Sequence, residues 1–398
     1  MYSSSQSNGA RQVRTLRDFD VDRSRGRDRE REREREREPD PTSSRSHPSL
    51  TESAELSSEL LSTFQVAKVF KDNTRHITSI DFDGDGYSCI TASEDESLRI
   101  YDVRSGKYGL VMDMSVDDRK DILLRNTVYS KKYGCALARF THRSTNIIYA
   151  STKEDDALRY MSFHDNKYIR YFKGHKKRVV ALVMSPQDDS ILSASLDDTV
   201  RFWDLRSPNC QGLMHTDGGN PCLAFDQGGY IFAVGLGSSK ILLYDIKEYY
   251  KGPFNTFTIK DPIVGDYLAE WSHMSFSNDG KLILISTKSN VLYIVDAYVG
   301  CIKHRLVGNM NQMGMAFEAC FSPDSAFVIC GSQDGKIHSW DVETGSHLQV
   351  LEWHREPPKV VAFNPKHLMF ASADTNLAFW IPPMPSVSAS GSFDAARR

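Results

Sequence analysis

The sequence lacks the long apolar segments that a membrane-spanning helix requires. None of its uninterrupted apolar runs approaches the roughly 18 residues needed to cross a bilayer. The first residues are polar and contain no apolar stretch of the signal-peptide type. We therefore expect neither secretion nor association with a membrane.

Cysteine is sparse and is never paired at short spacing. The seven cysteines stand singly, and no CxxC pair is present. Zinc sites need closely spaced thiolate or imidazole ligands, and a disulfide framework needs an even set of cysteines. The pattern instead indicates reduced thiols, buried as small core residues, in a protein of the cytosol or nucleus.

Glycine-rich motifs that bind phosphate groups are missing as well. The stretch GLGSSK at Gly235–Lys240 has neither the spacing of a dinucleotide-binding motif nor that of a P-loop lysine. GDG at Gly84–Gly86 is typical of a hairpin turn, where glycine supplies backbone freedom. The sequence thus predicts no cofactor and no metal site.

What the sequence does contain is a repeated acidic and aromatic pattern. It is clearest in SLDDTVRFWD, at Ser195–Asp204, and in GSQDGKIHSWD, at Gly331–Asp341. Each copy has small residues, a polar turn and an alternating apolar strand that ends in an aromatic or apolar residue. Catalytic residues are not normally repeated several times along a chain, so the pattern indicates architecture. Weaker copies end at Asp102, Asp245, Asp296 and Trp380.

The spacing of the copies identifies this architecture. Asp204, Asp245, Asp296 and Asp341 follow one another at intervals of 41, 51 and 45 residues. Repeats of about 40 to 45 residues that carry four short strands and end in Trp-Asp are typical of WD40 β-propeller blades. The longer interval between Asp102 and Asp204 contains one further blade, which lacks the Trp-Asp ending. We therefore predict an all-β, seven-bladed WD40 β-propeller over residues 64–382.

The two ends of this region are expected to meet in one blade. Residues 64–70 form a short strand that belongs to no complete repeat, whereas the last repeat stops after its aromatic strand at Trp380. A ring closes without open edges if the first strand completes the last blade.

Three segments are expected to lie outside the blades. Residues 1–60 contain an alternating Arg-Glu run within Ser-rich sequence, which buries too little apolar surface to offset the entropy of ordering it. This N-terminal tail is therefore predicted to be disordered. Residues 108–126, between the first two blades, predict an inserted loop, and residues 383–398 predict a flexible C-terminal tail.

The third blade contains residues that can brace the fold through hydrogen bonds. In a WD blade, a histidine, a serine, a turn aspartate and a tryptophan can form such a chain, because buried imidazole and indole groups need partners. Part of the set recurs in the sixth blade. The predicted structural residues are His175, Ser193 or Ser195, Asp197 and Trp203, together with Asp334 and Trp340.

His175, Asp197 and Ser195 are also the residue types of a nucleophilic triad. No glycine-rich nucleophile elbow accompanies them, and the group recurs in reduced form elsewhere in the chain. We therefore predict no catalytic residues and no enzymatic activity.

One basic and aromatic stretch is not explained by the repeat. It runs from Phe163 to Leu182, and with YSKKYG at Tyr129–Gly134 it predicts a basic patch that binds an acidic or phosphorylated peptide. Ordinary solubilising lysines remain the alternative interpretation. The candidate contact residues are Lys131, Lys132, Lys173, Lys176, Lys177 and Arg178.

Several segments resemble a known family more closely than the repeat requires. They include VYSKKYG at 128–134, FSNDGKLILIST at 276–287 and, most specifically, DLRSPNCQGLMH at 204–215. On these residues the region 64–382 is similar to the WD-repeat subunit of the COMPASS complex, the SET-domain histone H3 lysine-4 methyltransferase complex. The Arg-Glu tail and the segment 108–126 depart from that pattern.

This resemblance implies a non-catalytic scaffold in the nucleus. The implied partners are the SET-domain methyltransferase subunit and the phosphorylated C-terminal domain of transcribing RNA polymerase II, without direct sequence-specific binding of nucleic acid. The alternative is a subunit of a protein phosphatase 1 complex that acts in transcription termination and RNA 3′-end processing.

Overall fold

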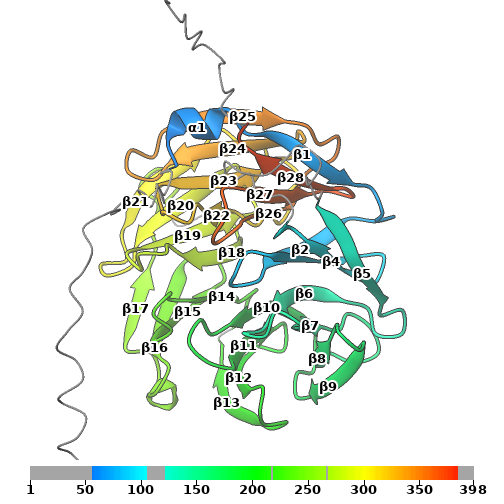
Figure 1. Ribbon diagram of the computed structural model, residues 1–398. Coiled ribbons are helices and arrows are strands. Elements are labelled where there is room, and N and C mark those ends of the chain that lie inside the picture. Colours follow the sequence, from blue (N-terminus) through cyan, green and yellow to red (C-terminus); the bar gives the residue numbers. More distant parts are fainter. Residues whose placement is uncertain (1–55, 105–121, 217, 266–267, 384–398) are drawn as a thin grey trace, which may run out of the picture. The chain divides into compact units, whose positions relative to one another are not determined.

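The computed structural model of the chain describes residues 56–104, 122–216, 218–265 and 268–383. In these residues, 28 strands form seven antiparallel sheets of four strands each. The sheets follow one another as the blades of a ring (Figure 1). This arrangement confirms the predicted all-β, seven-bladed propeller.

The first four blades are built from consecutive strands. Blade one consists of β2 (Ile77–Phe82), β3 (Ser88–Ser93), β4 (Ser97–Asp102) and β5 (Leu123–Tyr129). Blade two consists of β6 (Ala136–Phe140), β7 (Asn146–Ala150), β8 (Leu158–Ser162) and β9 (Lys167–Phe172). Blade three consists of β10 (Val179–Met184), β11 (Ser190–Ser195), β12 (Thr199–Asp204) and β13 (Cys210–His215). Blade four consists of β14 (Cys222–Phe225), β15 (Ile231–Leu236), β16 (Lys240–Asp245) and β17 (Asn255–Thr258), with the 3₁₀ helix η3 (Tyr249–Lys251) before its last strand.

The seventh blade combines both ends of the propeller. Blade five consists of β18 (Trp271–Phe276), β19 (Leu282–Thr287), β20 (Val291–Asp296) and β21 (Ile302–Val307). Blade six consists of β22 (Cys320–Phe321), β23 (Phe327–Gly331), β24 (Lys336–Asp341) and β25 (His347–Glu352). Blade seven consists of β26 (Val360–Phe363), β27 (Phe370–Ala373), β28 (Leu377–Ile381) and β1 (Gln65–Phe70).

The first strand of the chain is the outer strand of the last blade. β1 pairs with β28 from Gln65 opposite Ile381 to Phe70 opposite Leu377. Figure 1 shows the two strands side by side, one blue and the other red. Because this pairing covers the edge of β28, the ring has no open edge at its closure.

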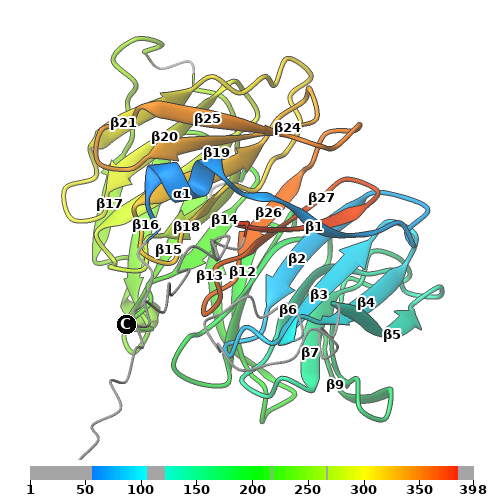
Figure 2. The same ribbon diagram turned by 45° about the horizontal axis from the view of Figure 1, so that its top comes forward.

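The expected N-terminal tail ends earlier than predicted. Residues 1–55 lie outside the described residues, but the helix α1 (Ser58–Ser62) begins inside the predicted tail of residues 1–60. Its N-cap is Ser57, whose side chain accepts a hydrogen bond from the Leu60 N–H. The helix forms because Leu61 is buried in the core between blades six and seven. Figure 2 shows α1 beside the strands of blade six.

The predicted inserted loop 108–126 also needs a correction. Residues 108–121 lie outside the described residues, whereas Leu123–Asn126 belong to strand β5. This strand pairs with β4 from Leu123 opposite Asp102 to Tyr129 opposite Ser97. Blade one needs this fourth strand to be complete. The strand was not predicted because its side chains, which are exposed or half-buried, give no alternating pattern in the sequence. The predicted C-terminal tail, residues 383–398, lies outside the described residues from 384 onward.

The core lies between neighbouring blades. The second strand of every blade is buried at each position, apart from Ile231 at the start of β15. Such strands are packed on both faces, which favours continuous apolar sequence over alternation. The described cysteines are all free, and most are buried or half-buried, but Cys301 is exposed, contrary to the expectation of core thiols.

The connections between strands lie on two faces of the ring. The top face holds the hairpins between the second and third strands and the connections to the next blade, such as residues 130–135 and 173–178. The bottom face holds the other connections, such as residues 226–229 and 297–301. Within the described residues, no helix is long and apolar enough to cross a membrane.

Candidate functional site

The top face of blade three contains a chain of buried polar contacts. The Nδ1 atom of His175 lies 3.2 Å from Oδ2 of Asp197, and its Nε2 atom lies 2.8 Å from Oγ of Ser193. The indole N–H of Trp203 donates to the same oxygen at 2.8 Å. The structure therefore brings together His175, Ser193, Asp197 and Trp203. Ser195 is not the serine of this chain.

Ser195 and Asp197 hold the loop that precedes blade three. The hydroxyl of Ser195 donates to the carbonyl oxygen of Lys177 at 2.7 Å. The backbone N–H of Lys176 donates to Oδ2 of Asp197 at 2.8 Å. The buried network thus fixes the backbone of the loop whose lysine side chains were predicted as partner contacts.

The same contacts set the ionisation of the two buried groups. Burial alone would raise the pKa of Asp197, but hydrogen bonds from Thr199 and the Lys176 N–H, together with His175, lower it to about 2. Burial lowers the pKa of His175, and the nearby carboxylate offsets this only in part. The carboxylate is therefore ionised and the imidazole neutral near pH 7.

The prediction that Asp334 and Trp340 repeat this chain in blade six is wrong. The indole N–H of Trp340 donates at 2.8 Å to the carbonyl oxygen of Val307, in blade five. Asp334 is exposed and accepts a backbone N–H from Lys336 at 3.3 Å. The reason is Cys330, which stands two strand positions after the register partner of Trp340, where blade three has Ser193. A thiol is a weak hydrogen-bond acceptor, so the indole bonds elsewhere.

A second complete chain lies in blade seven, where the sequence pattern was degenerate. His354 Nε2 lies 2.6 Å from Oγ of Ser372, and the Trp380 indole donates to that oxygen at 2.8 Å. His354 Nδ1 lies 3.2 Å from Oδ2 of Asp374, and both side chains are fully buried. Histidine and serine are 18 residues apart in both blades, and this spacing was the signal available in the sequence.

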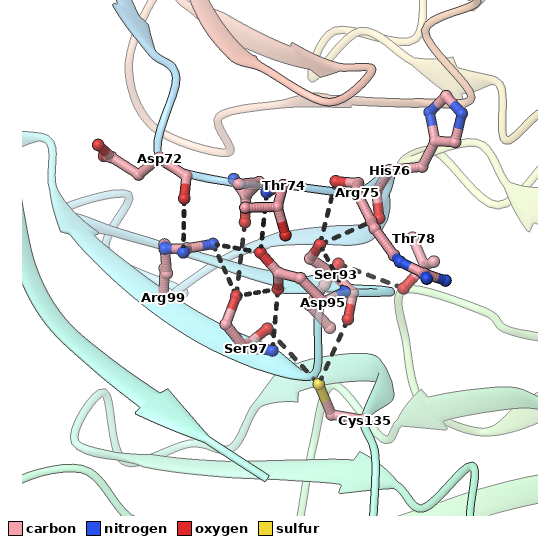
Figure 3. A network of polar contacts seen from close by, with 12 residues as sticks. Asp72, Thr74, Arg75, His76, Thr78, Ser93, Asp95, Ser97, Arg99 and Cys135 are labelled. Atoms are coloured by element: carbon pink, nitrogen blue, oxygen red, sulfur yellow. Dashed lines mark hydrogen bonds and ion pairs between the residues drawn. The ribbon is translucent and has the colours of Figure 1, made fainter. Parts of the chain in front are cut away.

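Blade one braces its top hairpin with an arginine in place of histidine. Figure 3 shows Asp95 between Ser97, Thr74 and Arg99. The guanidinium of Arg99 lies 3.4 Å from the carboxylate of Asp95 and donates to the carbonyl oxygen of Asp72 at 2.8 Å. A turn aspartate therefore ties the hairpin to the preceding loop in blades one, three and seven.

The predicted basic residues all lie on the top face, on the two loops that flank blade two. The loop between β5 and β6 carries one group, and the loop between β9 and β10 carries the other. Every one of these side chains is exposed. The two groups are Lys131 and Lys132, and Lys173, Lys176, Lys177 and Arg178.

A buried arginine links the first loop to the last strand of blade two. The guanidinium of Arg159, on β8, lies 3.4 Å from the ring centre of Tyr133 in the first loop and 5.1 Å from that of Tyr171 on β9. It also forms two 2.9 Å hydrogen bonds to the carboxylate of Asp155. Guanidinium groups stack favourably on aromatic rings, so Arg159 holds the first loop against strand β9, which leads into the second loop. Arg159 had no clear signal in the sequence, because blade two has Met161 at the tryptophan position and so lacks the recognisable ending.

The six basic side chains are free to bind anions. None of them forms an ion pair with another residue of the described ranges, whereas the neighbouring Lys153 pairs with Glu96. Lys131 and Lys132 instead lie over the rings of Tyr129 and Tyr133. Charge-assisted hydrogen bonds from lysine and arginine are strong interactions with phosphate groups. The surface formed by the six residues is called the basic patch below.

Comparisons with known proteins identify the family. The WD domain, G-beta repeat family matches residues 64–102, 166–204 and 313–341. WD repeat-containing protein 82 of Drosophila melanogaster is 46% identical over 329 residues, which are 82% of this chain and 97% of that protein. The Set1 complex component swd2 of Schizosaccharomyces pombe is 39% identical, covering 81% of this chain and 98% of that protein. The COMPASS component SWD2 of Saccharomyces cerevisiae is 32% identical, covering 77% and 90%. The chain therefore belongs to the family of WD-repeat proteins that includes these three relatives.

Proposed function

We propose that this protein is the WD-repeat subunit of a COMPASS-type histone H3 lysine-4 methyltransferase complex in the nucleus. The observation that carries the proposal is the similarity to two proteins named as Set1 or COMPASS components over at least nine tenths of their lengths. The proposed partner is the SET-domain methyltransferase subunit.

Its role in the complex is non-catalytic. Ser195, the serine of the alternative nucleophilic triad, is fully buried, and its hydroxyl donates to the Lys177 carbonyl oxygen. A nucleophile has to reach its substrate, so this serine cannot play that part. The polar residues of the blades instead stabilise the loops, and the loops present side chains to other macromolecules.

The proposed contribution of the basic patch is to bind the phosphorylated C-terminal domain of RNA polymerase II. A phosphoserine carries a charge of about −1.5 to −2 near pH 7 and three strong acceptor oxygens. The patch offers unpaired cations on two loops of the same face, and Arg159 contacts a tyrosine in the first loop and one on the strand before the second. An extended peptide lying across blade two can therefore present phosphate groups to both loops.

Affinity purification of the tagged full chain from nuclei tests the assignment to a complex. We expect SET-domain methyltransferase subunits to co-purify with it. Recovery of a protein phosphatase 1 complex without any methyltransferase subunit would instead support the alternative role in transcription termination.

Charge reversal in the basic patch tests the phosphopeptide contact. The variant Lys176→Glu, Lys177→Glu, Arg178→Glu is expected to weaken binding of a serine-phosphorylated polymerase repeat peptide by at least about tenfold. The loop should keep its shape, because its backbone is held by Ser195 and Asp197 rather than by these side chains. Fluorescence anisotropy with the labelled peptide measures the effect.

A matched control separates the patch from a general charge effect. The control variant reverses Lys240, Lys260 and Lys303, three exposed lysines of blades four and five. It has the same net charge as the first variant and should bind the phosphopeptide almost normally. Equal losses in both variants, or none in the first, would show that the basic patch is not the contact.

A further inference from the structure

A second candidate docking site lies on the bottom face, between blades four and five. A cavity of about 410 Å³ opens there, between the first hairpins of the two blades and the connections to their last strands. Its volume is within the roughly 300–1,000 Å³ typical of ligand pockets. Buried apolar side chains of both blades form part of its lining, among them Leu243 and Phe276.

The cavity contains a carboxylate without a cationic partner. Asp226 is half-buried, and one of its oxygens accepts the backbone N–H of Gly228 at 3.1 Å. No lysine, arginine or histidine of the described ranges forms an ion pair with it. By contrast, Asp279, which also lines the cavity, forms an ion pair with Lys281, whose Nζ lies 3.3 Å from the carboxylate. A half-buried, unpaired carboxylate is a favourable position for a cation.

Glycine leaves this carboxylate accessible. Gly280 has a φ of 70°, and a Cβ atom at this position would stand 2.8 Å from Oδ1 of Asp226. The oxygen that does not accept the Gly228 N–H therefore faces a hairpin without a side chain. A side chain at position 280 would collide with this oxygen, so the glycine keeps the neighbouring hairpin from covering it.

Two exposed aromatic rings belong to the lining of the cavity. The side chain of Phe254 is 57% exposed and that of Tyr298 is 71% exposed. Their backbones are fixed, since the Phe254 N–H donates to the Leu243 carbonyl oxygen and the Tyr298 N–H donates to the Asp296 carboxylate. Exposed rings held in place are costly in water and are typical of interaction surfaces.

We propose that this cavity binds an arginine side chain of an extended segment in a partner protein. A guanidinium satisfies the Asp226 carboxylate and stacks on the faces of Phe254 and Tyr298, while its methylene groups cover apolar lining. Lysine fits less well, because its ammonium group does not stack in this way. The charge sign separates this site from the basic patch, which binds anions on the opposite face.

The surroundings favour a polypeptide over a small molecule. Tyr230, Tyr250 and Val299 are exposed by 61% or more and belong to the same bottom-face connections of blades four and five. An extended chain anchored by one arginine can cover these residues, whereas a small cation would leave them in water.

Peptide selection on the full chain tests the proposal. Two libraries of random peptides, one with a fixed central arginine and one with a fixed central glutamine, are panned on the immobilised protein. We expect binders from the arginine library, and their Kd should rise at least about tenfold on Asp226→Asn. The asparagine keeps an oxygen for the Gly228 N–H, so the turn stays intact. Phe254→Ala, which removes an exposed ring, should cause a comparable loss.

The controls locate the binding site. Asp279→Asn removes a carboxylate from the same cavity that already has a lysine partner, and it should leave the Kd unchanged. The charge-reversed basic-patch variant should also bind the selected peptides normally. Absence of saturable binding up to about 1 mM, equally good binders from the glutamine library, or full binding by Asp226→Asn would each overturn the proposal.

Discussion

A chain that begins at residue 72 is expected to be recovered as unfolded or aggregated protein, whereas a chain that begins at residue 54 should fold like the full chain. The first truncation removes α1 and β1 and leaves the edge of β28 without its partner. An unpaired strand edge of this kind promotes association between molecules. The second truncation leaves intact the compact unit that starts at Ala54.

The energy lost in the first truncation is comparable to the stability of a whole domain. Leu61 and Phe64 are 0% and 4% exposed, and burying each side chain contributes roughly 1.5–3 kcal/mol. The pairing of β1 with β28 adds backbone hydrogen bonds with a net contribution of about 1 kcal/mol each. Native domains are stable by only about 5–15 kcal/mol, so the open ring should not persist.

Size-exclusion chromatography and circular dichroism distinguish the outcomes. A third chain, beginning at residue 64, keeps β1 but lacks α1, and it should be folded with a lower thermal midpoint. A monomeric chain from residue 72 with the midpoint of the full protein would show that closure by β1 does not stabilise the ring.

The number of blades and their closure were predictable because they depend on regular spacing. A blade needs four strands and their turns, so each copy of the acidic and aromatic pattern recurs after a similar number of residues. The strand at 64–70 could be assigned to the last blade because nothing else would cover its edge. The helix α1 was missed because its burial depends on Phe327 and Leu351, far away in the sequence.

Individual polar contacts were less predictable, since one substitution redirects them. Cys330 leaves Trp340 without a serine, and the indole then bonds across to blade five. In blade seven the serine and the tryptophan are eight residues apart, compared with ten in blade three. The turn between them is therefore shorter, and Asp374 follows its serine two positions sooner than Asp197 follows Ser193. The cavity at Asp226 had no sequence signal at all, because its lining comes from two separate blades.

Asp374→Ala is expected to cause the largest loss of stability among the single substitutions of turn aspartates. It leaves the fully buried imidazole of His354 without the carboxylate 3.2 Å away, and it removes the acceptor of the Asn376 backbone N–H. Leaving a buried polar group without its partner costs about 1–3 kcal/mol, and here a backbone N–H loses its acceptor as well. Urea unfolding followed by circular dichroism measures the difference in the free energy of unfolding.

The pH dependence of this loss has a definite sign. Burial would raise the pKa of Asp374, but the contacts with His354 and Asn376 outweigh it and lower that pKa below its ordinary value. A carboxyl group with a lowered pKa in the folded state stabilises the fold above its ordinary pKa of about 3.9, and this contribution is lost as the pH falls further. The difference in the free energy of unfolding between the unchanged protein and Asp374→Ala should therefore be constant from pH 7 to about 5 and become smaller below about pH 4.

Asp334→Ala is the matched control, because sequence alone assigns Asp334 the same position in its blade as Asp197. Its side chain is exposed and forms no hydrogen bond or ion pair with a histidine of the described residues, so the substitution should change the free energy of unfolding by no more than about 0.5 kcal/mol. A large loss in Asp374→Ala beside a negligible one in Asp334→Ala would show that the buried histidine and serine, rather than the turn aspartate itself, make the brace. Equal losses in the two variants would contradict this account, since the aspartate would then stabilise its hairpin without the buried chain.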